Sequence, residues 1–362
     1  MLVIAIVPSL PPSINGVGDY AFNLALQLRQ EFGIETQFIV CDPNWEKVSG
    51  LGSFSIQHIG QRSAANLLSI LNHQNISTVI LHYVGYGYAK RGYPAWLGEG
   101  LKTWKKQHQK ARLITMFHEV YASGPPWTSA FWLTSLQRSL ATQLSRMSNS
   151  LFTSKQAYAE IIQSLTPNSS SKLSLLPIFS SIGEPQTIPL LKDRSRRLVV
   201  FGHKNSRLRV YNEYLPQLKQ VCQQLQIQEI YDIGVPTNLE LSELIDVPVI
   251  EKGITAAPDV SNILLNSLAS LVGFPPPDYL AKSSIYASYC SHGVFSILPV
   301  GIVKPVDGLV AGKHYWALDC QTEPITLDRA QEIATHAYTW YQSHSLPEQA
   351  RIYATHLTAI PS

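Results

Sequence analysis

The sequence predicts an α/β protein with two domains, each built on a doubly wound parallel sheet. Three observations lead to this fold class. Short apolar runs, rich in β-branched residues, are typical of strands buried on both faces of a parallel sheet. Segments with helical spacing separate these runs, and the alternation occurs twice along the chain. The length of 362 residues suits two domains of roughly 100–200 residues each.

Ten apolar runs are the expected strands, five in each half of the chain. The runs of the first half are Leu2–Val7, Thr36–Val40, Val79–Tyr83, Leu113–Phe117 and Leu151–Thr153. The runs of the second half are Leu198–Gly202, Glu229–Gly234, Val247–Gly253, Ser270–Phe274 and Val294–Leu298. Helical spacing lies between them, as in Tyr20, Leu24, Ala25 and Leu28.

The stretch 166–197 is the expected domain boundary, because prolines, a Ser/Asn patch and the basic run Lys192–Arg197 gather there. After Ile325 the pattern predicts helices alone, over Leu327–Ser343 and Pro347–Leu357. We therefore expect a first domain over 1–175, a linker over 176–196, a second domain over 197–330, and C-terminal helices over 331–362 that cross back to the first domain.

The composition excludes several function classes. A net charge of +3 is too mild for a nucleic-acid footprint. No window approaches the roughly 18 apolar residues of a membrane span, and the apolar start of the chain is typical of a buried strand rather than a signal peptide. The four cysteines are far apart, which indicates reduced thiols in a cytoplasmic protein. Charged residues are only 15%, which suits a surface that meets a partner or a membrane.

Two loops at strand ends could bind an anion. In the first loop, Gly16 and Gly18 let the backbone approach a ligand at the start of a helix, and the alternative is a long turn with Asp19 as N-cap. In the second loop, a glycine turn at Gly202 precedes a cluster of cationic side chains, and the alternative is a solvated basic turn. The cationic groups of this second loop are His203, Lys204, Arg207 and Arg209.

A third candidate segment precedes the helix expected over Ile285–Ser291. Lys282, Ser283 and Ser284 offer a cation, two hydroxyls and helix-start amides, and the alternative is ordinary capping. In the first domain, His82 and His118 each end an apolar run, where a neutral imidazole can bind a hydroxyl group. A single histidine there is more often structural, and the two are not at metal-ligand spacing, so we expect no bound metal.

The ordered set of motifs resembles a known family. The segments that carry the resemblance are NGVGDYAFNLALQL, TMFHE, SKQAYAEII, SHGVFSI and DGLVAGKHYWALD. They resemble the bacterial GT-B glycosyltransferases, in particular the retaining "group 1" class called family 4. The resemblance implies two Rossmann-like domains facing across a cleft, with a nucleotide sugar bound mainly to the second and an acceptor to the first. It also implies transfer with retention and no essential metal or other cofactor.

The resemblance implies roles for individual residues. Gly16 and Gly18 would approach the donor diphosphate and sugar, while His118 would contact the donor sugar or the acceptor. Our own hypothesis, beyond the resemblance, is that His118 and Asp19 act in catalysis. We likewise expect acceptor hydroxyls to meet His82 and Glu119. The donor site would include Gly202, with His203 at the family's arginine position, Arg207 and Arg209 beside its lysine position, and Gly234 next to the base.

One element departs from the family pattern. The Glu-x7-Glu pair that holds the donor sugar and ribose is absent, and Asp278 and Tyr286 stand roughly in its register. Lys282, Ser283 and Ser284 could replace phosphate contacts, but they cannot replace a carboxylate that holds two ribose hydroxyls.

These observations predict a cytoplasmic glycosyltransferase that moves a sugar from a nucleotide-diphosphate sugar to a hydroxyl of a glycan, lipid or small molecule. Two alternatives stay open, namely a GT-B relative without catalysis that acts as a binding or regulatory partner, and a sugar-nucleotide epimerase. Aromatic side chains that could stack on sugars include Tyr83, Tyr86, Tyr88 and Trp127. The aromatic segment Tyr83–Trp96, with Lys90 and Arg91, is either a patch for peripheral membrane contact or a loop at the cleft mouth.

Overall fold

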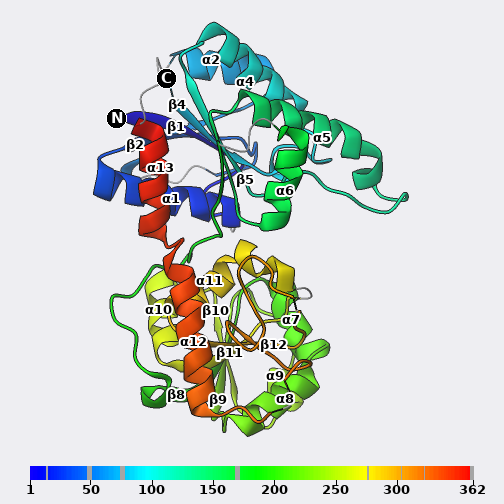
Figure 1. Cartoon of the computed structure of the whole chain (residues 1–362), viewed down its shortest axis with the longest axis vertical. Helices are drawn as coiled ribbons and strands as arrows, with labels where there is room; N and C mark the ends of the chain where they lie inside the picture. The colour runs from blue at the N-terminus through cyan, green and yellow to red at the C-terminus, as the bar shows by residue number, and fades with distance from the viewer. Residues whose placement is uncertain are drawn as a thin grey trace. The chain divides into compact units, whose positions relative to one another are not determined.

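The computed structural model describes residues 1–13, 15–46, 51–73, 78–167, 172–274, 277–302, 304–321 and 323–358. The chain forms two compact units (Figure 1). The first unit contains Met1–Pro177 and the C-terminal segment Leu346–Ser362, and the second contains Ile178–Ser345.

A seven-stranded parallel sheet forms the centre of the first unit, in the order β3-β2-β1-β4-β5-β6-β7. Its strands are β1 (Leu2–Val7), β2 (Glu35–Val40), β3 (Ser55–His58), β4 (Thr78–Tyr83), β5 (Arg112–Phe117), β6 (Ser150–Thr153) and β7 (Leu173–Leu175). Its helices are α1 (Gly16–Phe32), α2 (Ala64–His73), α3 (Gly85–Tyr88), α4 (Ala95–Gln107), α5 (Ser129–Met147), α6 (Gln156–Leu165) and α13 (Leu346–Thr358). A 3₁₀ turn, η1, spans Leu51–Ser53.

The order of strands in this sheet reverses between β1 and β4. Strands β2 and β3 extend the sheet on one side of β1, whereas β4 lies on its other side. The central strands are buried on both faces, and Ile4, Ile6, Leu81 and Leu113 have no exposed surface. In open α/β sheets, ligands bind beyond the carboxyl ends of the strands at such a switch point. We therefore expect a ligand site at the carboxyl ends of β1 and β4 and of the neighbouring strand β5.

The second unit has a six-stranded parallel sheet in the order β10-β9-β8-β11-β12-β13, with its own switch point between β8 and β11. Its strands are β8 (Ser195–Phe201), β9 (Glu229–Ile233), β10 (Val249–Gly253), β11 (Ser267–Leu271), β12 (Phe295–Leu298) and β13 (Trp316–Ala317). Its helices are α7 (Lys204–Asn212), α8 (Leu215–Gln224), α9 (Leu241–Leu244), α10 (Ala257–Leu265), α11 (Ser284–Ser291) and α12 (Leu327–Gln342). The 3₁₀ turns are η3 (Leu191–Asp193) and η4 (Pro277–Lys282).

The last helix, α13, packs against α1 within the first unit. The Tyr20 hydroxyl of α1 donates a 2.6 Å hydrogen bond to Gln349 Oε1 of α13. Gln349 Nε2 in turn donates to the carbonyl of Pro177, where the first unit ends. The C-terminal helix thus completes the core beside the start of α1.

The predicted fold class is confirmed, with three strands that the pattern missed. These are β3, β7 and β13, which are short and lie at or beside the sheet edges, where a strand does not need a continuous apolar run. The expected strand Ser270–Phe274 was placed three residues too late, because β11 spans Ser267–Leu271. Its run continues through Val272, which is also buried, so the apolar pattern alone does not mark where the strand ends.

Candidate functional site

Two histidines meet at the carboxyl edge of the first sheet. His82 lies in β4, and His118 directly follows β5, where its backbone N–H donates to the Tyr83 carbonyl at 2.9 Å. His82 Nδ1 and His118 Nε2 are 3.4 Å apart. The Tyr20 ring packs edge-on against both imidazoles, with centroids 5.7 Å from His82 and 5.0 Å from His118. The structure therefore brings together two residues that the sequence placed only at equivalent strand ends.

Burial holds the His82 imidazole neutral. His82 is 1% exposed, and desolvation lowers its pKa from 6.5 to about 3. A neutral imidazole both donates and accepts a hydrogen bond, which suits recognition of a hydroxyl group rather than of an anion. His118 is 5% exposed, so the two imidazoles present little accessible surface at this edge.

The start of α1 is capped by Asn15, and the alternative of Asp19 as N-cap is wrong. The Asn15 side chain accepts hydrogen bonds from the amides of Val17 and Gly18, at 2.9 and 3.2 Å. Gly18 is required by the loop itself, since a Cβ there would lie 2.4 Å from the carbonyl oxygen of Ser9. At Gly16, by contrast, a Cβ would meet nothing within 4 Å, so the backbone is open to a ligand there.

Asp19 lies in the first turn of α1 and is partly buried. Desolvation raises the pKa of its carboxyl from 3.8 to about 6. A carboxyl with a pKa near neutrality can accept a proton from a substrate hydroxyl. Glu119 follows His118 and is half-buried near Tyr83, whose pKa its charge helps to raise.

In the second unit, two loops and two helices meet at the switch point beside β8. Gly202 follows β8 with φ +129°, a conformation that favours glycine, and its N–H donates to the Ile233 carbonyl at the end of β9. His203 caps α7 by accepting from the Asn205 amide at 3.2 Å. Ile285, in the first turn of α11, packs over Gly202, since a Cβ there would lie 3.3 Å from the Ile285 side chain. The starts of α7 and α11 are thereby neighbours.

Arg207 has a structural role, which corrects its assignment to the donor diphosphate. Its side chain is fully buried and forms an ion pair with Asp232 of β9. The guanidinium also donates to the carbonyls of Gly202 and Val235, and Tyr211 donates to the second oxygen of Asp232 at 2.9 Å. These bonds tie the α7 loop to the end of β9 and leave the guanidinium no path to a diphosphate.

Gly234 belongs to the same arrangement. It has φ +143°, and a Cβ there would lie 2.6 Å from the Gly202 carbonyl oxygen and 2.9 Å from the Arg207 guanidinium. Arg209 lies on the outer face of α7, where it pairs with Glu213 at 3.2 Å and keeps 36% of its side chain exposed. Arg209 is thus accessible, but on the surface of the helix rather than at its start.

The segment before α11 contains a capping residue and one cationic side chain. Ser283 is the N-cap, accepting from the Tyr286 amide at 3.1 Å, and Ser284 begins the helix. Lys282 is half-buried, with its ammonium 5.0 Å from the centre of the Tyr279 ring. Tyr286 is fully buried and donates to the His314 carbonyl, so it cannot stand in for a sugar-binding glutamate. The side chain of Asp278 lies outside the described residues.

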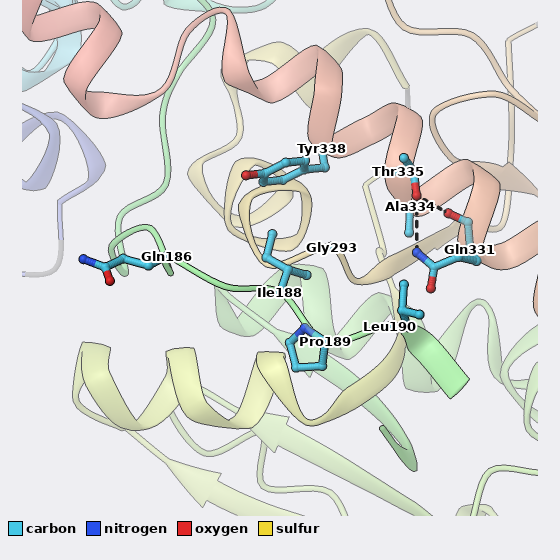
Figure 2. A pocket seen from close by; sticks show the side chains of 9 residues that line it. All are labelled: Gln186, Ile188, Pro189, Leu190, Gly293, Gln331, Ala334, Thr335 and Tyr338. Carbon is cyan, nitrogen blue, oxygen red and sulfur yellow. Dashed lines mark hydrogen bonds between the residues drawn. The ribbon is translucent and has the colours of Figure 1, made fainter. Parts of the chain in front are cut away.

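A separate cavity of about 290 Å³ lies in the second unit between the segment 186–190 and α12 (Figure 2). Its lining residues are Gln186, Ile188, Pro189, Leu190, Gly293, Gln331, Ala334, Thr335 and Tyr338. None of these side chains is charged. Gly293 precedes β12 and Leu190 precedes β8, so the cavity lies at the amino ends of these strands. It is therefore distinct from the carboxyl edge that carries Gly202 and Lys282.

No family model and no curated protein sequence matches the chain. Solved structures do match it, over nearly the whole length of both chains. The lipopolysaccharide outer core galactosyltransferase WaaB in its apo form is 13% identical with a TM-score of 0.54, covering 99% of this chain and 100% of that one. The UDP-GlcNAc 2-epimerase from Neisseria meningitidis bound to UDP-GlcNAc is 12% identical with a TM-score of 0.61, covering 99% of each chain.

An α-glucosyltransferase in complex with UDP-glucose and DNA containing an abasic site is 11% identical with a TM-score of 0.52, covering 96% of this chain and 94% of that one. The fold is GT-B. Likeness at this identity shows the fold, and it includes both transferases and an epimerase. The fold alone therefore does not distinguish a transferase from an epimerase. The residues at the carboxyl ends of the two sheets must distinguish them.

Sequence reasoning missed the residues that organise the first GT-B unit. Tyr20 has the spacing of a core position on α1, and nothing in the pattern connects it to Gln349, 329 residues later. In the segment Tyr83–Trp96, Tyr83 and Tyr88 are buried, and Tyr86, at 42%, is the most exposed aromatic residue. The aromatic residues that are most exposed lie instead on and before α5.

Proposed function

We propose that this protein is a glycosyltransferase that moves a sugar from a nucleoside-diphosphate sugar to a hydroxyl acceptor, which is a glycan, a lipid or a small molecule. The observation that carries the proposal is the meeting of Gly202 with the starts of α7 and α11 at the switch point of the second sheet. Such an arrangement is suited to a diphosphate. The GT-B fold supports it, because solved structures of that fold include a galactosyltransferase and a glucosyltransferase with UDP-glucose.

We assign the donor site to the second unit. The positive ends of the α7 and α11 dipoles lie beside Gly202, and Lys282 precedes the N-cap of α11. During transfer, negative charge develops on the leaving diphosphate. Lys282 and the two helix starts, with the hydroxyl of Ser284, would stabilise that charge. Because Gly202 has no side chain, Ile285 packs against it and the starts of α7 and α11 come close together.

We assign acceptor recognition to the first unit. His82 and His118 would hydrogen-bond sugar or acceptor hydroxyls as neutral imidazoles. Asp19, with its pKa raised to about 6, would accept the proton of the attacking hydroxyl. We further propose that transfer retains the anomeric configuration and needs no essential metal, as the resemblance of the motifs implies.

The experiment that tests the function follows both possible products. The full chain is incubated with a panel of labelled nucleoside-diphosphate sugars, with and without a pool of glycan and lipid acceptors. A transferase releases free nucleotide and labels the acceptor only when acceptor is present. An isomeric nucleotide sugar formed without acceptor would instead show an epimerase. Saturable binding with neither product across the panel would show a binding protein and overturn the proposal.

A further inference from the structure

The start of α5 and the loop before it present an unusual exposed surface in the first unit. Trp127 is 84% exposed, Trp132 72%, Phe131 45% and Leu136 43%. We name these four residues the aromatic patch. Isolated exposed apolar residues are ordinary, but large aromatic side chains gathered on consecutive turns indicate an interaction surface. Figure 1 shows the connection from β5 to α5 extending away from the sheet.

Three residues of the patch lie on α5, and Trp127 lies in the loop before the helix. Trp132 and Leu136 are four residues apart, so they lie on one face of the helix, and Phe131 is in ring contact with Trp132 at 5.4 Å. The side of α5 opposite Phe131 and Trp132 carries Gln137, Ala141 and Leu144, which are buried. The helix is therefore anchored by one side, and its aromatic side is left without a protein partner among the described residues.

A buried glutamine holds the patch to a neighbouring basic loop. Gln137 is 1% exposed, and its side chain accepts from the Ala122 amide at 2.9 Å and donates to the Arg91 carbonyl at 3.0 Å. Thr134 adds a bond to the Ala122 carbonyl at 3.2 Å. These bonds join α5 to the loop before Trp127 and to the backbone of Arg91, which is exposed like Lys90.

The segment that carries the patch has charges of one sign, and Glu99 is the exposed acidic residue on the neighbouring helix α4. Residues 120–159 contain no aspartate or glutamate, while Arg138 and Arg146 are exposed on α5. Phe131 and Arg138 line one shallow hollow, and Lys102 of α4 and Arg146 line the next. At about 1.5 Å per residue, Arg138 lies roughly 9 Å along the helix from Trp132. Aromatic side chains beside basic ones favour a surface that is apolar within and anionic at its boundary.

We propose that the aromatic patch docks this protein on an anionic lipid bilayer. Trp127, Phe131 and Trp132 enter the boundary between headgroups and acyl chains, where indole rings are favoured, and the flanking cations contact the lipid phosphates. None of the described helices is long and apolar enough to cross a membrane. The charge complementarity selects a bilayer over a second copy of the chain, since two such surfaces would bring cations of the same sign together.

The test is flotation of the full chain with vesicles of equimolar phosphatidylglycerol and phosphatidylcholine, compared with phosphatidylcholine alone. The chain is expected to float with the anionic vesicles and much less with the neutral ones. The double variant Trp127→Ser/Trp132→Ser should lower the partition coefficient about tenfold or more. Arg138→Gln should lower it about fivefold on anionic vesicles, an effect that added salt removes.

The matched control is Ile254→Ser in the second unit. Ile254 is 72% exposed, as Trp132 is, and its replacement should leave flotation unchanged. A blue shift of tryptophan fluorescence on anionic vesicles, lost in the double variant, gives a second readout that does not require donor or acceptor. Because neither readout involves sugar transfer, failure here is distinguishable from failure of the proposed function.

Three results would overturn the proposal. The first is no flotation with anionic vesicles by the wild-type chain. The second is an equal loss of flotation in Ile254→Ser. The third is a self-association of the wild-type chain, seen by sedimentation, that the double variant abolishes while vesicles bind neither protein, because the patch would then be an interface between copies.

Discussion

Arg207 and Lys282 are similar in the sequence but differ in what they can do, because they differ in burial. Both follow a strand of the second sheet. Arg207 lies in the first turn of α7, and Lys282 precedes α11. Arg207 is fully buried against Asp232, whereas Lys282 is half-buried beside an aromatic ring. Arg207 pairs with Asp232, which lies 25 residues later in β9, so no local sequence pattern indicates this ion pair. Residue type and strand-end position therefore do not distinguish a structural cation from an accessible one.

His118 is the residue whose loss should affect the reaction most. If His118 contacts the transferred sugar or the acceptor, His118→Ala should lower kcat by about 100-fold while the Kd of the nucleotide stays unchanged. His118→Gln, which keeps a donor and an acceptor, should recover part of the rate. Because His118 is buried, thermal unfolding of each variant must be measured alongside. Unchanged kcat in a folded His118→Ala protein would assign the imidazole to the core.

The partly buried Asp19 carboxylate should lower the free energy of unfolding at high pH and also accept a proton in the reaction. Its pKa is raised from 3.8 to about 6, so between these values the folded state holds a proton that the unfolded state has lost. The free energy of unfolding therefore falls as the pH rises through this window. Asp19→Asn should remove that loss and raise the free energy of unfolding by about 1–2 kcal/mol near pH 8, after allowance for partial exposure and the α1 dipole, with little effect near pH 4.

The same variant should be slower in transfer, because the amide cannot accept the acceptor proton. Urea unfolding at the two pH values and kcat at the higher one measure both effects. An equal stability difference at both pH values would mean that ionisation of Asp19 is not the cause.

At the scale of elements, the start of α1 separates a structural glycine from an open one. Gly18→Ala should lower the free energy of unfolding by about 1–3 kcal/mol, since the new methyl would strike the Ser9 carbonyl. Gly16→Ala meets open space, so its stability should stay within about 0.5 kcal/mol of wild type. Chemical denaturation of the two variants compares the same substitution two residues apart.

If a ligand approaches the backbone at Gly16, Gly16→Ala should weaken its binding although the fold is intact. Full ligand affinity in a stable Gly16→Ala protein would remove this loop from the site. The sequence placed both glycines in a ligand loop, and it could not separate them because the contact that constrains Gly18 is with backbone.

The apolar pattern predicted the central strands of both sheets but missed three strands at the sheet edges. The run Leu2–Val7 coincides with β1, which is buried on both faces and so has a continuous apolar sequence. Strand β3, Ser55–His58, lies at the sheet edge, and its side chains are half-buried or exposed, so polar residues are tolerated there. The helices Leu327–Gln342 and Leu346–Thr358 agree closely with their predicted ranges because each carries a regular buried stripe.

At the scale of the whole molecule, the sequence predicted the GT-B fold but not how each site is built. Alternating periodicity and strand-end glycines repeat in both halves, and this repetition is a property of the chain that needs no contacts to be seen. The contact of Tyr20 with Gln349 and the packing of Ile285 over Gly202 join elements far apart in sequence. Such contacts depend on the final packing, so residue patterns could not supply them.

The most direct test of the central claim is a calorimetric titration with a panel of nucleoside diphosphates and the matching nucleosides. Wild type, Lys282→Ala and Lys252→Ala are compared, because both lysines lie over a tyrosine ring, at 5.0 and 4.4 Å, but Lys252 belongs to the edge strand β10. Lys282→Ala should weaken the preferred diphosphate about tenfold or more and leave its nucleoside unchanged, while Lys252→Ala changes neither. Absence of diphosphate binding to the wild type at millimolar concentration, or equal weakening of diphosphate and nucleoside by Lys282→Ala, would contradict the account.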